Sequence, residues 1–215
     1  MAAKIIDKVK DVVGDNVIVE VTSLNDYINT AIAELSEVIP ADILLKYHNG
    51  AATTLSNSPK TLDVAGNKVL AVLRKDSSDI LRDCMQVNQI DFETKYNNSG
   101  STYSATDLTP VWSTIKEVLH ISPEPTATET ASVYKFTYPS TDWGASSAVA
   151  ITGIPTELEQ AVIFRAGMNI IQSYLSKAVQ EDEDAEMQSM LTGQAQALST
   201  AYQQEVARYM KGGAS

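Results

Sequence analysis

The chain has 215 residues, of which 44% are hydrophobic and 20% charged, a balance typical of a folded globular protein and not of a disordered one. Lys and Arg number 16 and Asp and Glu 27, so the formal net charge is −11, which disfavours a protein that grips nucleic-acid phosphates. A single cysteine, Cys84, precludes an internal disulfide, and two histidines leave little for a metal site built from thiolate and imidazole.

Apolar residues at helical spacing predict three helices in the first fifty residues. The first covers residues 3–13. The second begins at Thr22 or Ser23 and ends at Ile39, because Pro40 cannot continue it. A short third helix ends at Tyr47. Charges among the first thirteen residues spoil a secretory signal and a membrane span, so we expect a soluble product without a membrane partner.

From residue 51 the pattern changes from helical to strand-like. The Ala, Thr, Ser and Asn of residues 51–59 indicate a loop. The expected strands are 61–64 and 68–74, forming a hairpin over a Gly/Asn turn, and 111–121 and 132–138. Residues 83–87 form a further strand or a return segment. Because helical segments precede and follow this region, we interpret it as a β module inserted between helices.

The last third of the chain predicts two long helices. Pro155 suits a first helical position, and an apolar stripe follows it to about Val179. After the acidic run Glu181–Asp184, a second stripe continues to Gly212. The predicted fold is therefore α+β: a mainly α-helical bundle with a long C-terminal helical hairpin and an inserted antiparallel β module. The expected parts are 1–58 (N-terminal helices), 59–150 (β module) and 151–215 (hairpin and tail).

Residues that could carry chemistry are few, and none forms a catalytic pattern. The Glu181–Asp184 run favours a solvated helix start, with cation or partner contact as the alternative. His48 and His120 have no ligand or triad partner at a useful spacing, and Cys84 is typical of a small buried hydrophobe. No glycine-rich phosphate loop is present. We therefore assign no catalytic, cofactor-binding or metal residue and expect no cofactor and no enzymatic activity.

Aromatic residues gather in the middle segment of the chain. They pack a sheet core in the favoured interpretation, and they form an exposed protein interface in the alternative one. The residues concerned are Tyr96, Tyr103, Trp112, Tyr134, Phe136, Tyr138 and Trp143.

The order of short motifs resembles the neck proteins of tailed bacteriophages, the head-to-tail adaptors, which are also called connector or head-completion proteins. A helical amino end precedes the motifs, and a helical hairpin follows them. The motifs are Val72–Asp76, Asp83–Cys84, Lys95–Tyr96, Thr109–Trp112, Leu119–Thr126, Val133–Pro139 and Ile154–Pro155. The resemblance spans about residues 20–210, and no single motif is specific by itself.

This resemblance implies a virion structural protein at the head-tail junction, made in the host cytoplasm. Such a protein forms a homo-oligomeric ring, commonly a dodecamer of twelve copies, that contacts the portal protein and a downstream neck or tail protein. Double-stranded DNA passes through the channel of the ring without specific binding. The long acidic amino terminus is less typical of the family.

Two features of the residues agree with this expectation. The apolar stripes of the two long C-terminal helices need partner surface, which identical neighbours in a ring supply. Splitting the chain at residues 58 and 154 gives net charges of −4, −3 and −4, and such an acidic wall lets DNA slide. The candidate oligomer interface is Met187, Met190, Leu191, Leu198, Tyr202 and Tyr209, although several of these residues can instead pack inside one subunit.

Three other functions stay open. A tail-terminator or tail-tube component would place β-sheet around the channel. A small hydrolase would use an acidic pair such as Asp182 and Asp184, which would bind a metal. A generic binding module would capture a partner without forming a ring.

Overall fold

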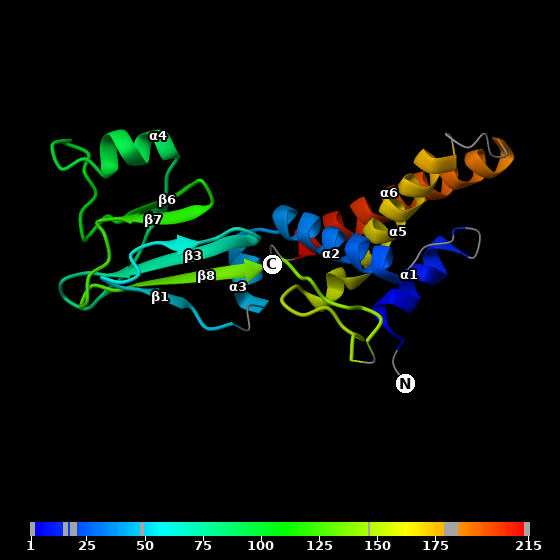
Figure 1. Cartoon of the computed structure of the whole chain (residues 1–215), viewed down its shortest axis with the longest axis horizontal. Helices are drawn as coiled ribbons and strands as arrows, with labels where there is room; N and C mark the ends of the chain where they lie inside the picture. The colour runs from blue at the N-terminus through cyan, green and yellow to red at the C-terminus, as the bar shows by residue number, and fades with distance from the viewer. Residues whose placement is uncertain are drawn as a thin grey trace. The chain divides into compact units, whose positions relative to one another are not determined.

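The structure is a computed structural model that describes residues 3–14, 17, 21–47, 50–145, 147–178 and 185–212. The chain divides into two compact units (Figure 1). The helical unit combines Met1–Ile39 with Tyr138–Ser215, and the β unit is Pro40–Thr137. The amino-terminal and carboxy-terminal parts of the chain therefore fold together.

The helical unit contains the long helices that the apolar periodicity predicts. Their bounds are α1 (Ile5–Val13), α2 (Val21–Val38), the 3-10 turn η2 (Thr156–Leu158), α5 (Glu159–Ala178) and α6 (Ala185–Gly212). Helix α5 packs against α1, α2 and α6, and its buried residues lie on more than one face (Figure 1). It is therefore the core helix of this unit. Among the described residues, no helix is both long enough and apolar enough to cross a bilayer.

Two contacts hold α1, α5 and α6 against one another. A Cβ atom on Gly167 of α5 would lie 3.3 Å from Val12 Cγ1 and 3.4 Å from Leu198 Cδ1, so this glycine permits close helix approach. The Gln194 amide on α6 donates from Nε2 to the carbonyls of Val12 and Val13, at 2.8 and 3.2 Å. It satisfies carbonyls that the end of α1 leaves without an intrahelical partner.

The segment after the β unit returns to the helical unit and packs on α2. Trp143 is buried there, and its indole Nε1 donates to Asn29 Oδ1 at 2.8 Å. Its backbone N–H donates to Asn25 Oδ1 at 3.0 Å. Trp143 and Tyr138, which the sequence groups with the sheet aromatics, therefore belong to the helical unit.

The β unit contains two four-stranded sheets among its described residues. One sheet has the order β1-β8-β3-β4 and the other β2-β7-β6-β5. The unit also contains α3, α4 and the π-helical turn η1. The bounds are α3 (Ala41–Tyr47), β1 (Thr53–Leu55), β2 (Leu62–Asp63), β3 (Asn67–Lys75), β4 (Leu81–Asp83), β5 (Met85–Gln86), α4 (Gln89–Asp91), η1 (Phe92–Tyr96), β6 (Val111–Ile115), β7 (Val118–Ser122) and β8 (Ala131–Thr137).

The core of the β unit contains apolar side chains from both sheets. Val72 and Val133 come from the first sheet, and Trp112, Leu119 and Ile121 come from the second. Helix α3 packs on β3, while α4 and η1 pack on β6 (Figure 1). The sheets therefore share one apolar layer, and short helices contact a strand of each sheet.

The fold class predicted from the sequence is wrong. The protein is a mixed α/β structure, 46% helical and 20% strand, and not a mainly helical bundle with a small β module. The module is also not purely antiparallel, because β5 pairs with β6 in parallel, with Met85 opposite Val111. Strand β1 was missed because it lies in the predicted loop 51–59, which has little apolar character.

Two predicted strand arrangements in the middle of the chain are also wrong. The expected strand 111–121 is a hairpin of β6 and β7, in which Lys116 and Glu117 both have positive φ angles of 49° and 64°. Neither is a glycine, so the turn leaves no clear sequence signal. The expected hairpin 61–74 does not form either: β2 pairs with β7, while β3 pairs with β8 and β4.

Candidate functional site

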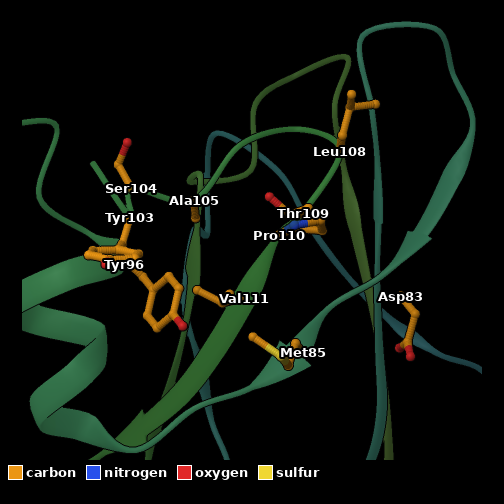
Figure 2. A pocket seen from close by; sticks show the side chains of 10 residues that line it. All are labelled: Asp83, Met85, Tyr96, Tyr103, Ser104, Ala105, Leu108, Thr109, Pro110 and Val111. Atoms are coloured by element: carbon orange, nitrogen blue, oxygen red, sulfur yellow. The ribbon is translucent and has the colours of Figure 1, made fainter. Parts of the chain in front are cut away.

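A pocket of about 260 Å³ lies in the β unit, where the loop after η1 approaches the paired strands β5 and β6. Figure 2 shows Tyr96, Tyr103, Ser104 and Ala105 on one side of the pocket and Asp83 on the other, with Met85 and Val111 between them. The remaining lining residues are Leu108, Thr109 and Pro110. The lining is mostly apolar and contains one acidic residue.

Local hydrogen bonds hold the two sides of the pocket in place. The Ala105 N–H donates to the Tyr96 carbonyl at 2.9 Å and folds the loop back onto the end of η1. The Met85 N–H donates to the Pro110 carbonyl at 3.0 Å and joins β5 to the start of β6. Both sides are therefore fixed by backbone contacts within the β unit.

Three large apolar side chains at the rim of the pocket are exposed to solvent. The exposed fractions are 56% for Met85 and 67% each for Tyr103 and Leu108. Of the ten large hydrophobic residues that are exposed in the described parts of the chain, seven lie in the β unit. Large apolar side chains that gather at one pocket commonly mark an interaction site, whereas single exposed ones carry no such meaning.

The carboxylate of Asp83 is the uncompensated charge of this pocket. No hydrogen bond or ion pair of its side chain occurs among the described residues. The neighbouring carboxylates are paired: Asp107 accepts from Arg74 Nη1 at 2.9 Å, and Asp79 accepts from Lys75 Nζ at 2.6 Å. A cationic group placed near Asp83 would therefore meet a carboxylate with no cation of its own beside it.

Arg74 connects three segments of the β unit, including the loop that carries Leu108. Its side chain is 1% exposed, and it donates from Nη1 to Asp107 and from Nη2 to Glu129 Oε2 at 2.8 Å. Its Nε has no hydrogen-bond partner among the described residues. Arg74 thereby links β3 to the loops that precede β6 and β8. The loop that carries Leu108 is therefore held in place by contacts within the chain itself and needs no partner protein for this.

The structure places the predicted interface residues of α6 in different environments. Leu191 and Leu198 are buried within the chain itself, while Met187, Tyr202 and Tyr209 are half-buried. Met190 is 50% exposed. Of the six residues, Met190 has the most side-chain surface available for a second subunit.

Tyr202 contacts a charged pair inside the helical unit. The Arg165 guanidinium lies 5.7 Å from the Tyr202 ring centroid and donates from Nε to Glu34 Oε2 at 2.6 Å. The hydrogen bond from Arg165 is the main cause that lowers the pKa of Glu34, against an opposing contribution from burial. The ring of Tyr202 is thus partly committed to an intramolecular contact.

The residues considered for chemistry do not converge on a site in the described parts of the chain. His120 lies on β7, with its ring centroid 6.4 Å from that of Phe92. Cys84 is buried, and burial is the main cause that raises the pKa of its thiol to about 12, so the nucleophilic thiolate is suppressed. No group of three or more potential metal ligands occurs among the described residues. His48 and the Glu181–Asp184 run lie outside those residues.

The sequence singled out Tyr96 and Tyr103 as aromatics but did not predict the pocket. Its members come from three stretches that are separated in the chain, so no local period brings them together. The one available signal was Leu108 in an otherwise polar stretch. A comparison with protein-family models finds no match, and a comparison with curated proteins finds none either.

Proposed function

We propose that this chain is a head-to-tail adaptor of a tailed bacteriophage, a virion structural protein that forms a ring between portal and tail. The ring continues the DNA channel, and the commonly observed copy number of the resembled family is twelve. The proposal rests on the motif order described above together with the charge distribution of the folded chain.

The distribution of charge between the two units carries the proposal. The helical unit has 7 basic and 16 acidic residues, a net charge of −9, whereas the β unit has 9 and 11, a net charge of −2. The acidic excess that looks evenly spread along the sequence therefore falls mainly within the residues of the helical unit. A unit with a strongly negative net charge suits the wall of a DNA conduit, because it repels phosphates and does not retain them.

Helix α6 supplies the surface for lateral contact between subunits in this proposal. It has 28 residues and is about 42 Å long at 1.5 Å per residue. Its buried residues Leu191, Ala195 and Leu198 face its own chain, while Met190 and Met210 are exposed. Because a ring repeats each contact at every subunit boundary, a modest apolar contact per subunit is sufficient.

Native mass spectrometry at increasing protein concentration tests ring formation, and electron microscopy of particles containing the chain tests its position. We expect a closed ring with helices around the channel. Met190→Glu should weaken the ring, whereas Gln196→Glu adds the same charge at another exposed position of α6 and should not. A protein that stays monomeric at every concentration and is absent from the neck of the particle would refute the proposal.

The second candidate is a tail-terminator or tail-tube component. The two four-stranded sheets favour it, because β-sheet lines the channel in such proteins. The same electron microscopy distinguishes the two functions: β-sheet density around the bore supports the tail component, and helical density supports the adaptor.

A further inference from the structure

We propose that the pocket of the β unit is a docking site for an extended segment of another protein, which inserts one large apolar side chain beside Asp83 and carries Lys or Arg two residues away. This proposal does not depend on the adaptor function. It rests on the size, lining, exposure and charge of the pocket.

The size of the pocket selects the kind of occupant. Pockets that bind small molecules or cofactors commonly have volumes of about 300–1,000 Å³. The volume of about 260 Å³ lies just below that range, and it is large enough to admit one large apolar side chain. An anchor residue from a partner protein, held in a pocket and surrounded by weaker contacts, is the usual arrangement at a protein interface.

The lining provides the contacts that such an anchor requires. Val111 forms a buried apolar part of the lining, and the rings of Tyr96 and Tyr103 border one side. Met85 and Leu108 are more than half exposed, so an inserted side chain would cover apolar surface that now faces solvent. The Ala105 side chain is small and leaves room for the ring of the anchor.

The position of Asp83 specifies the charge and spacing of the partner. Asp83 and Met85 are exposed, whereas Cys84 between them is buried, which is the alternation of an extended segment. Side chains two residues apart lie about 7 Å from each other on one face. A partner strand that places its apolar anchor in the pocket can therefore place a basic side chain two residues away near Asp83.

Charge complementarity favours a different protein over a second copy. The whole chain carries a net charge of −11, so long-range attraction is stronger for a basic protein than for a second copy of the chain. A partner with basic residues is attracted both by that net charge and by the unpaired Asp83 carboxylate. We therefore commit to a basic, apolar segment of another protein as the occupant.

The test uses a short synthetic peptide, GSRSWSRSG, in which both arginines lie two residues from the tryptophan. Its binding to the full-length chain is followed by NMR chemical-shift changes of the backbone amides. We expect the changes to centre on residues 83–85 and 103–111. Replacing the tryptophan of the peptide by alanine should weaken binding by at least about tenfold, and replacing both arginines by glutamate by about three- to tenfold.

Three variants of the protein locate the contact. Ala105→Trp fills the pocket, and Tyr103→Ser removes a wall residue that is already largely exposed and so leaves the fold intact. Both should reduce binding by at least about tenfold. Asp83→Asn should bind the arginine peptide no more tightly than it binds a peptide in which both arginines are replaced by serine. The matched control Asp79→Asn removes an exposed carboxylate that does not line the pocket, and it should bind as the parent does.

Three results would overturn the proposal. The first is that no amide of the pocket shifts at the highest peptide concentration. The second is that the alanine peptide binds as well as the tryptophan peptide, or that Ala105→Trp and Tyr103→Ser bind as the parent does. The third is that the same amides shift with protein concentration alone and that Ala105→Trp abolishes this shift, because the occupant is then a second copy of the chain.

Discussion

Arg74→Met should destabilise the β unit by about 3 kcal/mol. Removing one partner of a fully buried ion pair costs about 3–5 kcal/mol, because the remaining charge is left without compensation. Here the arginine is 1% exposed, but the side chains of Asp107 and Glu129 are 37% and 24% exposed, so water compensates part of the loss. The two loops that Arg74 connects should also lose their fixed positions.

The control for this prediction is Lys60→Met, which also removes a cation from an ion pair of the β unit. Lys60 Nζ and Glu124 Oε2 are 2.6 Å apart, closer than either contact of Arg74. Both side chains are about half exposed or more, at 49% and 60%, so the pair is worth only about 0–1 kcal/mol. Burial, and not distance, should therefore decide the ranking of the two variants.

The assay is urea unfolding followed by the fluorescence of Trp112, which is buried in the core of the β unit. Parent and variants carry Trp143→Phe, so that the signal reports this unit alone. A triple variant, Arg74→Met with Asp107→Asn and Glu129→Gln, should regain part of the lost stability because it leaves no unpaired charge. The reasoning is wrong if Arg74→Met costs no more than Lys60→Met, or if the triple variant is less stable than the single one.

Three further predictions concern other parts of the chain. Gly167→Leu should destabilise the helical unit by about 1–3 kcal/mol in thermal unfolding, because its Cβ site is crowded, whereas Gly193→Leu, with open space around it, should not. Cys84 should react with a thiol reagent at mildly alkaline pH only after the protein unfolds, because burial raises the pKa of its thiol to about 12. Rapid labelling of the folded protein would contradict this. Glu34 has a lowered pKa in the folded protein, so its stabilising contribution is present above its ordinary pKa of 4.5 and is lost as the pH falls through the folded pKa. Glu34→Gln should therefore lose less stability in acid than the parent does, and an unchanged pH profile would refute this.

The sequence by itself determined the elements that depend on neighbouring residues. The apolar spacing of Ile5–Val13 and the stripe of α5 predicted these helices, because a helix places residues three and four apart on one face. Pro40 likewise predicted the end of α2. The burial of Cys84 also followed from its sequence context.

Only the tertiary structure decided which distant segments pair. The partner of β2 is β7 and not the adjacent β3. The parallel pairing of β5 with β6 joins segments that are separated in the chain, so the spacing of residues within either segment could not predict it. The pocket around Met85 and Tyr103 exists only because of that pairing. The charge pattern has the same origin: the first and last parts of the chain form one unit, and this unit therefore contains acidic residues that lie far apart in the sequence.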